Sequence, residues 1–83
     1  MTWWSLGRVE EEAESAQAKY GPFTSTHEAY GVLAEELKEL LDAIHLNDIE
    51  AIKGEAIQVA AVATRLAEQC ATAVPSFTNR SGI

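Results

Sequence analysis

The sequence has too little of several residue types to fit many common protein classes. Its one cysteine, Cys70, excludes a disulfide within the chain, and no Cys or His pair has the spacing of a zinc site. There is no glycine-rich phosphate loop, and no apolar run approaches the ~20 residues of a membrane span. Residues 1–8 lack a basic region followed by a long apolar stretch, so we expect no signal peptide. These absences favour a cytoplasmic protein without a membrane partner.

Positive charge is also scarce. The chain has 6 Lys and Arg against 13 Asp and Glu, which gives a formal net charge of −7. Because contacts with the phosphates of a duplex depend on Lys and Arg, this balance argues against a nucleic-acid duplex as partner. A single nucleotide remains compatible with the charge if a metal ion carries its phosphates.

Apolar residues recur at helical spacing in three segments, so we expect an all-α fold. Gly21-Pro22 ends the first helix, Ser25 and Glu28 form a capping box for the second, and Asn47 and Asp48 are both suitable N-caps for the third. The expected bounds are Trp3 or Trp4 to Lys19, Thr26 to about His45, and about Asp48 to Ala71. We expect one domain over residues 1–73 and a flexible tail over residues 74–83, which lack any apolar period.

The third helix predicts an oligomer. From Ala56 to Ala63 it is apolar on nearly every side except at Gln58, and a helix that is apolar all round is buried all round. Two neighbouring helices of one short chain cannot cover such a surface, and a small domain without disulfide or zinc needs a further source of stability. We therefore expect an antiparallel helical bundle completed by a second copy of the chain.

Three glutamates stand out because of where the helical period places them. Glu55 shares a face with Val62 and Leu66, so its carboxylate is directed to the interior, where an unpaired charge is costly. Glu36 and Glu39 are i,i+3 neighbours at the edge of the apolar stripe of the second helix, so their like charges converge. A shared cation resolves both problems. Carboxylate oxygens suit Mg²⁺ or Mn²⁺ better than zinc.

These residues also form a recognisable pattern. Glu35-Glu36-x-x-Glu39 on one helix, followed by Glu55-x-x-Gln58 and an apolar run on the next, resembles the MazG-like members of the all-α nucleoside triphosphate pyrophosphatase superfamily. The resemblance covers residues 27–65, about half of the chain. The family has Glu-x-x-Asp on the second of these helices, so Gln58 offers a neutral amide oxygen where the family has a charged ligand.

The resemblance implies an enzyme that binds Mg²⁺ and cleaves a nucleoside triphosphate, ribo or deoxy, to the monophosphate and pyrophosphate. It also implies a homodimer or a homotetramer. Glu35 is the expected base, and if Gln58 is a ligand then Gln58→Asp should strengthen metal binding. The implied residues are the metal ligands Glu36, Glu39, Glu55 and Gln58, the catalytic Glu35, Glu36 and Glu39, and the substrate-binding cations Arg65, Lys38 and Lys53, with Arg65 as phosphate clamp.

Two alternatives stay open at this point. The chain could be a helical assembly module in which Glu55 makes a structural salt bridge, for example to Lys38, or a catalytically silent binder of nucleotide or metal. The glutamate run of the first helix, residues 10–14, is typical of a solvated face. Trp3 and Trp4 fit hydrophobic anchors better than base-stacking residues, and Cys70 fits a small buried side chain.

Overall fold

The computed structural model describes residues 3–72, and within them the chain is helical, with no strand. The helices are α1, Trp4–Tyr20, α2, Thr26–Leu46, and α3, Ile49–Ala71. The expectation of an all-α chain with three helices is confirmed, and each bound agrees to within about a residue. The tail expected over residues 74–83 lies outside the described residues.

Local capping explains where α2 and α3 begin. The Ser25 hydroxyl accepts a hydrogen bond from the Glu28 amide at 3.0 Å, and the Glu28 carboxylate accepts one from the Thr24 amide at 2.9 Å. The Asp48 carboxylate caps α3 by accepting from the Ala51 amide at 3.1 Å. Asn47, which the sequence also allowed as an N-cap of the third helix, is the C-cap of α2, with a left-handed φ of 55° that Asn tolerates well. The chain therefore reverses over two residues, and α2 and α3 become antiparallel neighbours.

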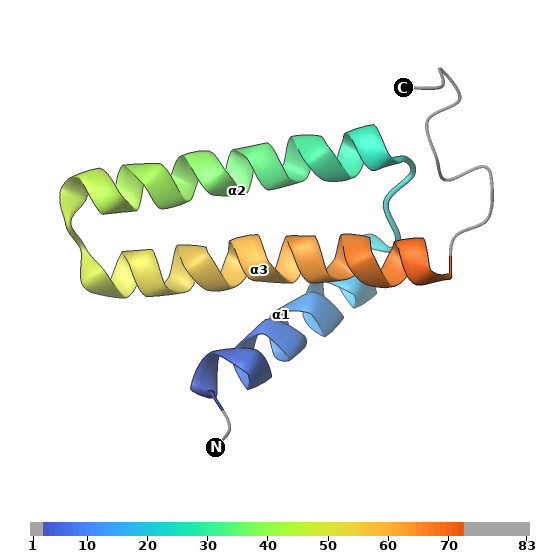
Figure 1. Cartoon of the computed structure of the whole chain (residues 1–83), viewed down its shortest axis with the longest axis horizontal. Helices are drawn as coiled ribbons and strands as arrows, with labels where there is room; N and C mark the ends of the chain where they lie inside the picture. The colour runs from blue at the N-terminus through green and yellow to red at the C-terminus, as the bar shows by residue number, and fades with distance from the viewer. Residues whose placement is uncertain (1–2, 73–83) are drawn as a thin grey trace.

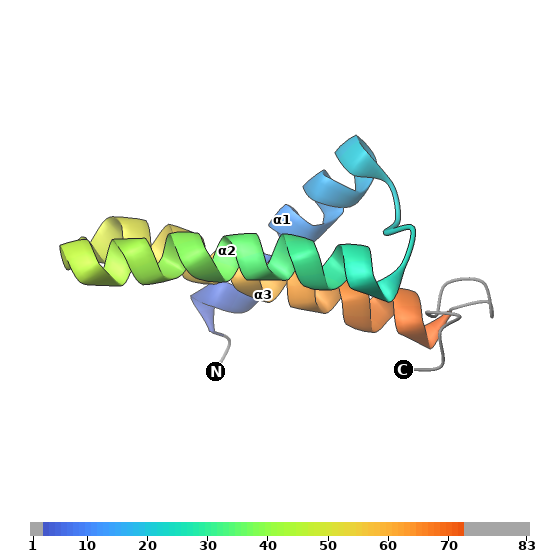
Figure 2. The same cartoon turned by 90° about the horizontal axis from the view of Figure 1, so that it is seen from above.

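The third helix is the centre of the molecule. It packs along α2 as an antiparallel hairpin, while α1 crosses its other side obliquely (Figures 1 and 2). Contacts between α1 and α2 are few, so these two helices meet mainly through α3. The buried centre is small: Phe23, Ala29 and Val62 form it, with half-buried Val32, Leu33 and Leu66 against them.

The single chain leaves apolar surface uncovered on α2 as well as on part of α3. Ile57, Ala61 and Val62 of α3 are buried within the chain, because α1 and α2 cover two sides of this helix. Ala56 and Ala63 stay exposed and Val59 and Ala60 are half-buried, so burial of residues 56–63 by a second copy stays a prediction. The uncovered stripe lies on α2, at Tyr30, Leu37, Leu41 and Ile44, which are 68%, 48%, 47% and 48% exposed.

Several single residues also have defined places. Cys70 is exposed, which corrects the expectation of a small buried side chain. Trp3 and Trp4 are 68% and 58% exposed at the start of α1. In residues 3–72, no helix has the length and apolar character needed to cross a membrane.

Candidate functional site

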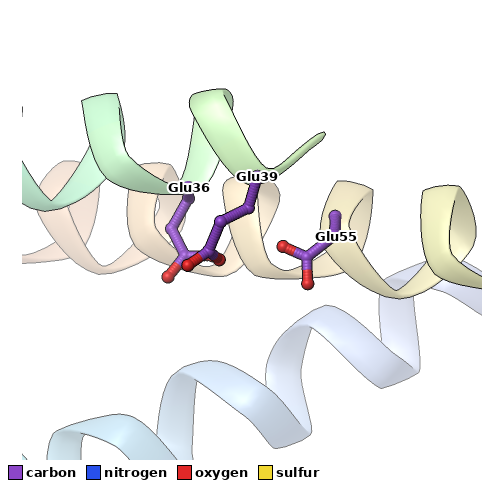
Figure 3. Close-up of side chains that lie close together, drawn as sticks. All are labelled: Glu36, Glu39 and Glu55. Atoms are coloured by element: carbon purple, nitrogen blue, oxygen red, sulfur yellow. The ribbon is translucent and has the colours of Figure 1, made fainter. Parts of the chain in front are cut away.

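The structure brings Glu36, Glu39 and Glu55 together. Each carboxylate offers an oxygen atom, and these oxygens all lie within 4.8 Å of one another. Glu36 and Glu39 come from successive turns of α2 and Glu55 from the facing part of α3, and all three side chains point toward the side of the hairpin where α1 lies (Figure 3). The convergence follows from the i,i+3 spacing and from the antiparallel pairing of the two helices.

Glu36 and Glu55 are half-buried, and each has one buried carboxylate oxygen without a hydrogen-bond donor. Glu36 Oε2 and Glu55 Oε2 are both inaccessible to solvent and have no partner among residues 3–72. Burial raises the pKa of Glu36, and the charges of Glu39 and Glu55 add to the rise. Burial likewise raises the pKa of Glu55, followed by a hydrogen bond and the charge of Glu39. Among the described residues, neither Glu36 nor Glu55 has a positive partner, because none of the ion pairs within 4.0 Å includes either of them.

The lysines expected near the cluster have other partners. Lys38 Nζ lies 2.9 Å from a carboxylate oxygen of Asp42, one turn along α2 on the solvent side. Lys53 Nζ lies 2.9 Å from Glu50 and 5.3 Å from the centre of the Trp4 ring. The structural salt bridge between Lys38 and Glu55, considered above as an alternative, is not present. Among the residues that the structure describes, Glu55 has no ion pair of any kind within 4.0 Å.

The donor set fits a hard divalent cation. Three carboxylates supply only oxygen, and two of them carry an oxygen that lacks any other partner. Mg²⁺ and Mn²⁺ prefer such oxygen ligands, and binding either ion would compensate the buried charges. Glu36, Glu39 and Glu55 are therefore the residues that would hold such an ion.

A groove of about 540 Å³ is lined by residues of α1, of the loop that follows it, of α2 and of α3, and Glu36 is one of them. Its volume is within the ~300–1,000 Å³ typical of small-molecule sites. Glu36 belongs to both the groove and the carboxylate cluster, so a ligand in the groove can reach an ion held by the cluster. The other expected site residues that line the groove are Glu35, Gln58 and Arg65. Neither Lys38 nor Lys53 does.

Arg65 is a structural residue at the end of the groove away from the cluster. It is only 9% exposed, its Nη2 donates to the Gly21 carbonyl at 3.0 Å, and its Nε donates to Gln17 Oε1 at 3.3 Å. Its guanidinium carbon lies 4.4 Å from the centre of the Phe23 ring. Arg65 thus ties α1 and the following loop to α3. This arrangement uses two of its donors within the chain and leaves the expected phosphate contact as a prediction.

Glu12 is the residue that the sequence analysis missed. The amide nitrogen of Gln58 donates to Glu12 Oε2 at 3.0 Å, and Arg8 contacts the other oxygen at 3.4 Å. Glu10, Glu11 and Glu14 are exposed, as expected of a solvated face, but Glu12 is half-buried. Helical spacing would have indicated that Glu12 faces the other helices, because it is three residues after Val9 and four before Ala16, which both lie on the covered side of α1.

Comparisons of the chain with protein-family models, with curated proteins and with solved structures find no match.

Proposed function

We propose that this chain is a Mg²⁺-dependent nucleoside triphosphate pyrophosphohydrolase of the cytoplasm, which converts a ribo or deoxy nucleoside triphosphate to the monophosphate and pyrophosphate. The observation that carries the proposal is the pair of buried, unpartnered carboxylate oxygens of Glu36 and Glu55 beside Glu39. Of these residues, Glu36 also lines a groove of about 540 Å³, a volume with room for a nucleotide. The resemblance of residues 35–58 to the pyrophosphatase pattern supports the same reaction.

The residues have separate parts in this proposal. Glu36, Glu39 and Glu55 would hold the ion, which when bound neutralises phosphate charge and lowers the pKa of an attacking water. Glu35 lines the groove, is exposed, and is not one of the three clustered carboxylates, so one of its oxygens is free to accept a proton from that water. Phe23 and Tyr20 also line the groove and offer aromatic surface for the nucleoside part of the substrate.

The direct test is product analysis. The purified chain is incubated with canonical ribo and deoxy nucleoside triphosphates in millimolar Mg²⁺ or Mn²⁺, and the products are separated by ion-exchange chromatography. Monophosphate with pyrophosphate is the expected result, and Glu36→Gln should abolish it. Diphosphate with orthophosphate would contradict the bond assignment. A chain that is inert on the whole panel would leave the alternative, a non-catalytic module that binds metal or nucleotide or assembles with itself.

We also infer that the active form is a homo-oligomer joined through α2. Tyr30, Leu37, Leu41 and Ile44 follow one another at spacings of seven, four and three residues and form one exposed apolar stripe along the helix. The stripe is centred on Leu37, with Tyr30 seven residues before it and Ile44 seven after it. Two copies that pack antiparallel about this centre place Tyr30 of one against Ile44 of the other. The two hairpins then form a four-helix bundle, as a homodimer or as half of a homotetramer.

A further inference from the structure

We propose that Glu12 is a positioning residue for the metal and nucleotide site: its carboxylate orients the Gln58 amide so that the amide oxygen faces the groove. The proposal rests on the proposed function, because it assigns a role to Gln58 beside the ion. It adds α1 to the residues that determine metal affinity. Nothing in the pattern of glutamates on α2 and α3 points to a contribution from α1.

The contact itself is specific. Gln58 Nε2 of α3 lies 3.0 Å from Glu12 Oε2 of α1. The two residues are 46 positions apart in the chain, so the hydrogen bond joins two separate helices. Both side chains are half-buried. Gln58 follows Glu55 by one turn of α3 and lines the groove together with Glu36. The hydrogen bond therefore lies directly beside the candidate metal ligands, and not at a distant surface.

Elementary chemistry determines which way the amide points. An ionised carboxylate has no proton to donate, so only the amide nitrogen of Gln58 can face Glu12. The amide oxygen and nitrogen diverge from the same carbon atom, so the oxygen is directed away from Glu12. A neutral oxygen is then available on the groove side, where it can accept a hydrogen bond or ligate a hard cation. If the amide were reversed, its N–H groups would face the cation site and weaken binding.

This pairing bears on one expectation from the sequence, which stays a prediction. An Asp at position 58 was expected to strengthen metal binding, because it adds a charge. In this chain a carboxylate at position 58 meets the Glu12 carboxylate and replaces a hydrogen bond by repulsion. The charge can be added only if position 12 supplies a donor in return. Exchanging the two side chains, with Glu12→Gln and Gln58→Glu, keeps both the net charge and the hydrogen bond.

Glu11 provides a matched control on the same helix. It shares Arg8 with Glu12, at 2.9 Å against 3.4 Å, but its side chain is 64% exposed and makes no contact with Gln58. Glu11→Ala removes the same charge and the stronger of the two Arg8 contacts. Any effect that depends only on negative charge or on Arg8 will therefore appear in Glu11→Ala as well as in Glu12→Ala.

The experiment measures Mn²⁺ affinity by calorimetric titration and the melting temperature without metal, for the full chain at one protein concentration. Loss of a residue that orients a ligand typically weakens metal binding 10–100-fold, so we expect Glu12→Ala to bind Mn²⁺ about tenfold more weakly and Glu11→Ala to bind it as wild type does. Gln58→Glu alone should melt below wild type. The exchange variant should recover the melting temperature and bind Mn²⁺ more tightly than wild type.

Three results would overturn the proposal, and they identify different errors. If wild type binds Mn²⁺ and Glu12→Ala binds it equally well, Glu12 has no positioning role although the metal site stands. If the exchange variant melts no higher than Gln58→Glu, the two side chains are not coupled. If wild type binds no Mn²⁺ at all, the metal site of the proposed function fails, and the role of Glu12 fails with it.

Discussion

Replacing Glu55 by Gln should make the metal-free protein more stable and the metal-bound protein less stable. The first effect follows from the buried Oε2 atom, which has no donor within the described residues. An amide of nearly the same shape removes that charge, and its N–H group can donate to the carboxylate of Glu39 or Glu36. The second effect follows from the loss of one of three candidate ligands.

The two effects have comparable and measurable sizes. Leaving a buried polar group without a partner costs about 1–3 kcal/mol, and more for a charge, so relief of that cost should add at least about 1 kcal/mol to the stability of the variant. In a domain of this size 1 kcal/mol shifts the melting temperature by roughly 4–8 °C. Mn²⁺ at about 100 times its dissociation constant should stabilise wild type by about 2.7 kcal/mol, or roughly 10–20 °C. The order of the two melting temperatures should therefore invert when metal is added.

Thermal melts followed by circular dichroism, with and without Mn²⁺ at constant protein concentration, test this inversion. Glu68→Gln is the control, because it makes the same change on an exposed part of α3, outside the cluster. It should leave the Mn²⁺ shift unaltered. The reasoning is refuted if Mn²⁺ leaves wild type unchanged while Glu55→Gln lowers the metal-free melting temperature, since Glu55 would then be an ordinary stabilising side chain.

Three further predictions concern the assembly, the pH dependence and the attachment of α1. Leu41→Glu adds a charge to the exposed stripe of α2 and should shift sedimentation equilibrium at micromolar concentration toward monomer; a wild type that is already a monomer there contradicts the proposed interface. The pKa values of Glu36 and Glu55 are raised above 4.5 in the folded chain, so the folded state binds more protons than the unfolded state in the window above that value. Metal-free stability should therefore fall as pH rises through the raised pKa values. Saturating Mn²⁺ should reverse the slope of stability against pH, because the ion competes with those protons. Parallel slopes with and without the ion would argue against a shared site. Arg65→Met should lower the free energy of unfolding by about 2–3 kcal/mol in urea titrations, because it removes two hydrogen bonds from a buried guanidinium, and an unchanged midpoint would show that these bonds do not hold α1.

The fold was predictable from the sequence where its determinants are local. Ser25 with Glu28, and Asp48 with the following turn, cap helices through neighbours three positions away, so the sequence alone places these ends. The face of α2 that packs against α3 was harder to predict from the sequence. Leu33, Leu37, Leu40 and Leu41 of that helix cover a wide arc, and helical periodicity cannot decide which half of such an arc faces α3. The structure turns Leu33 and Leu40 toward the interior and leaves the other two uncovered.

The candidate site shows the same division. The meeting of Glu36, Glu39 and Glu55 was predictable, because it needs only one i,i+3 pair and an antiparallel hairpin with a short turn. The contact of Glu12 with Gln58 depends instead on the angle at which α1 crosses α3, and no local spacing determines that angle. The i,i+4 spacing of Lys38 and Asp42 was visible in the sequence and would have indicated that this lysine has a partner outside the cluster.

The weak attachment of α1 has a consequence for amide hydrogen exchange. No residue of α1 is buried, whereas α2 and α3 both contribute to the buried centre. Segments with few buried contacts open at lower free energy than the whole chain unfolds. We expect the amides of α1 to exchange as one early unit, while those of the α2 and α3 hairpin exchange only on global unfolding. Because Ala16 and Tyr20 of α1 line the groove, each such opening should also widen the groove and admit solvent to it.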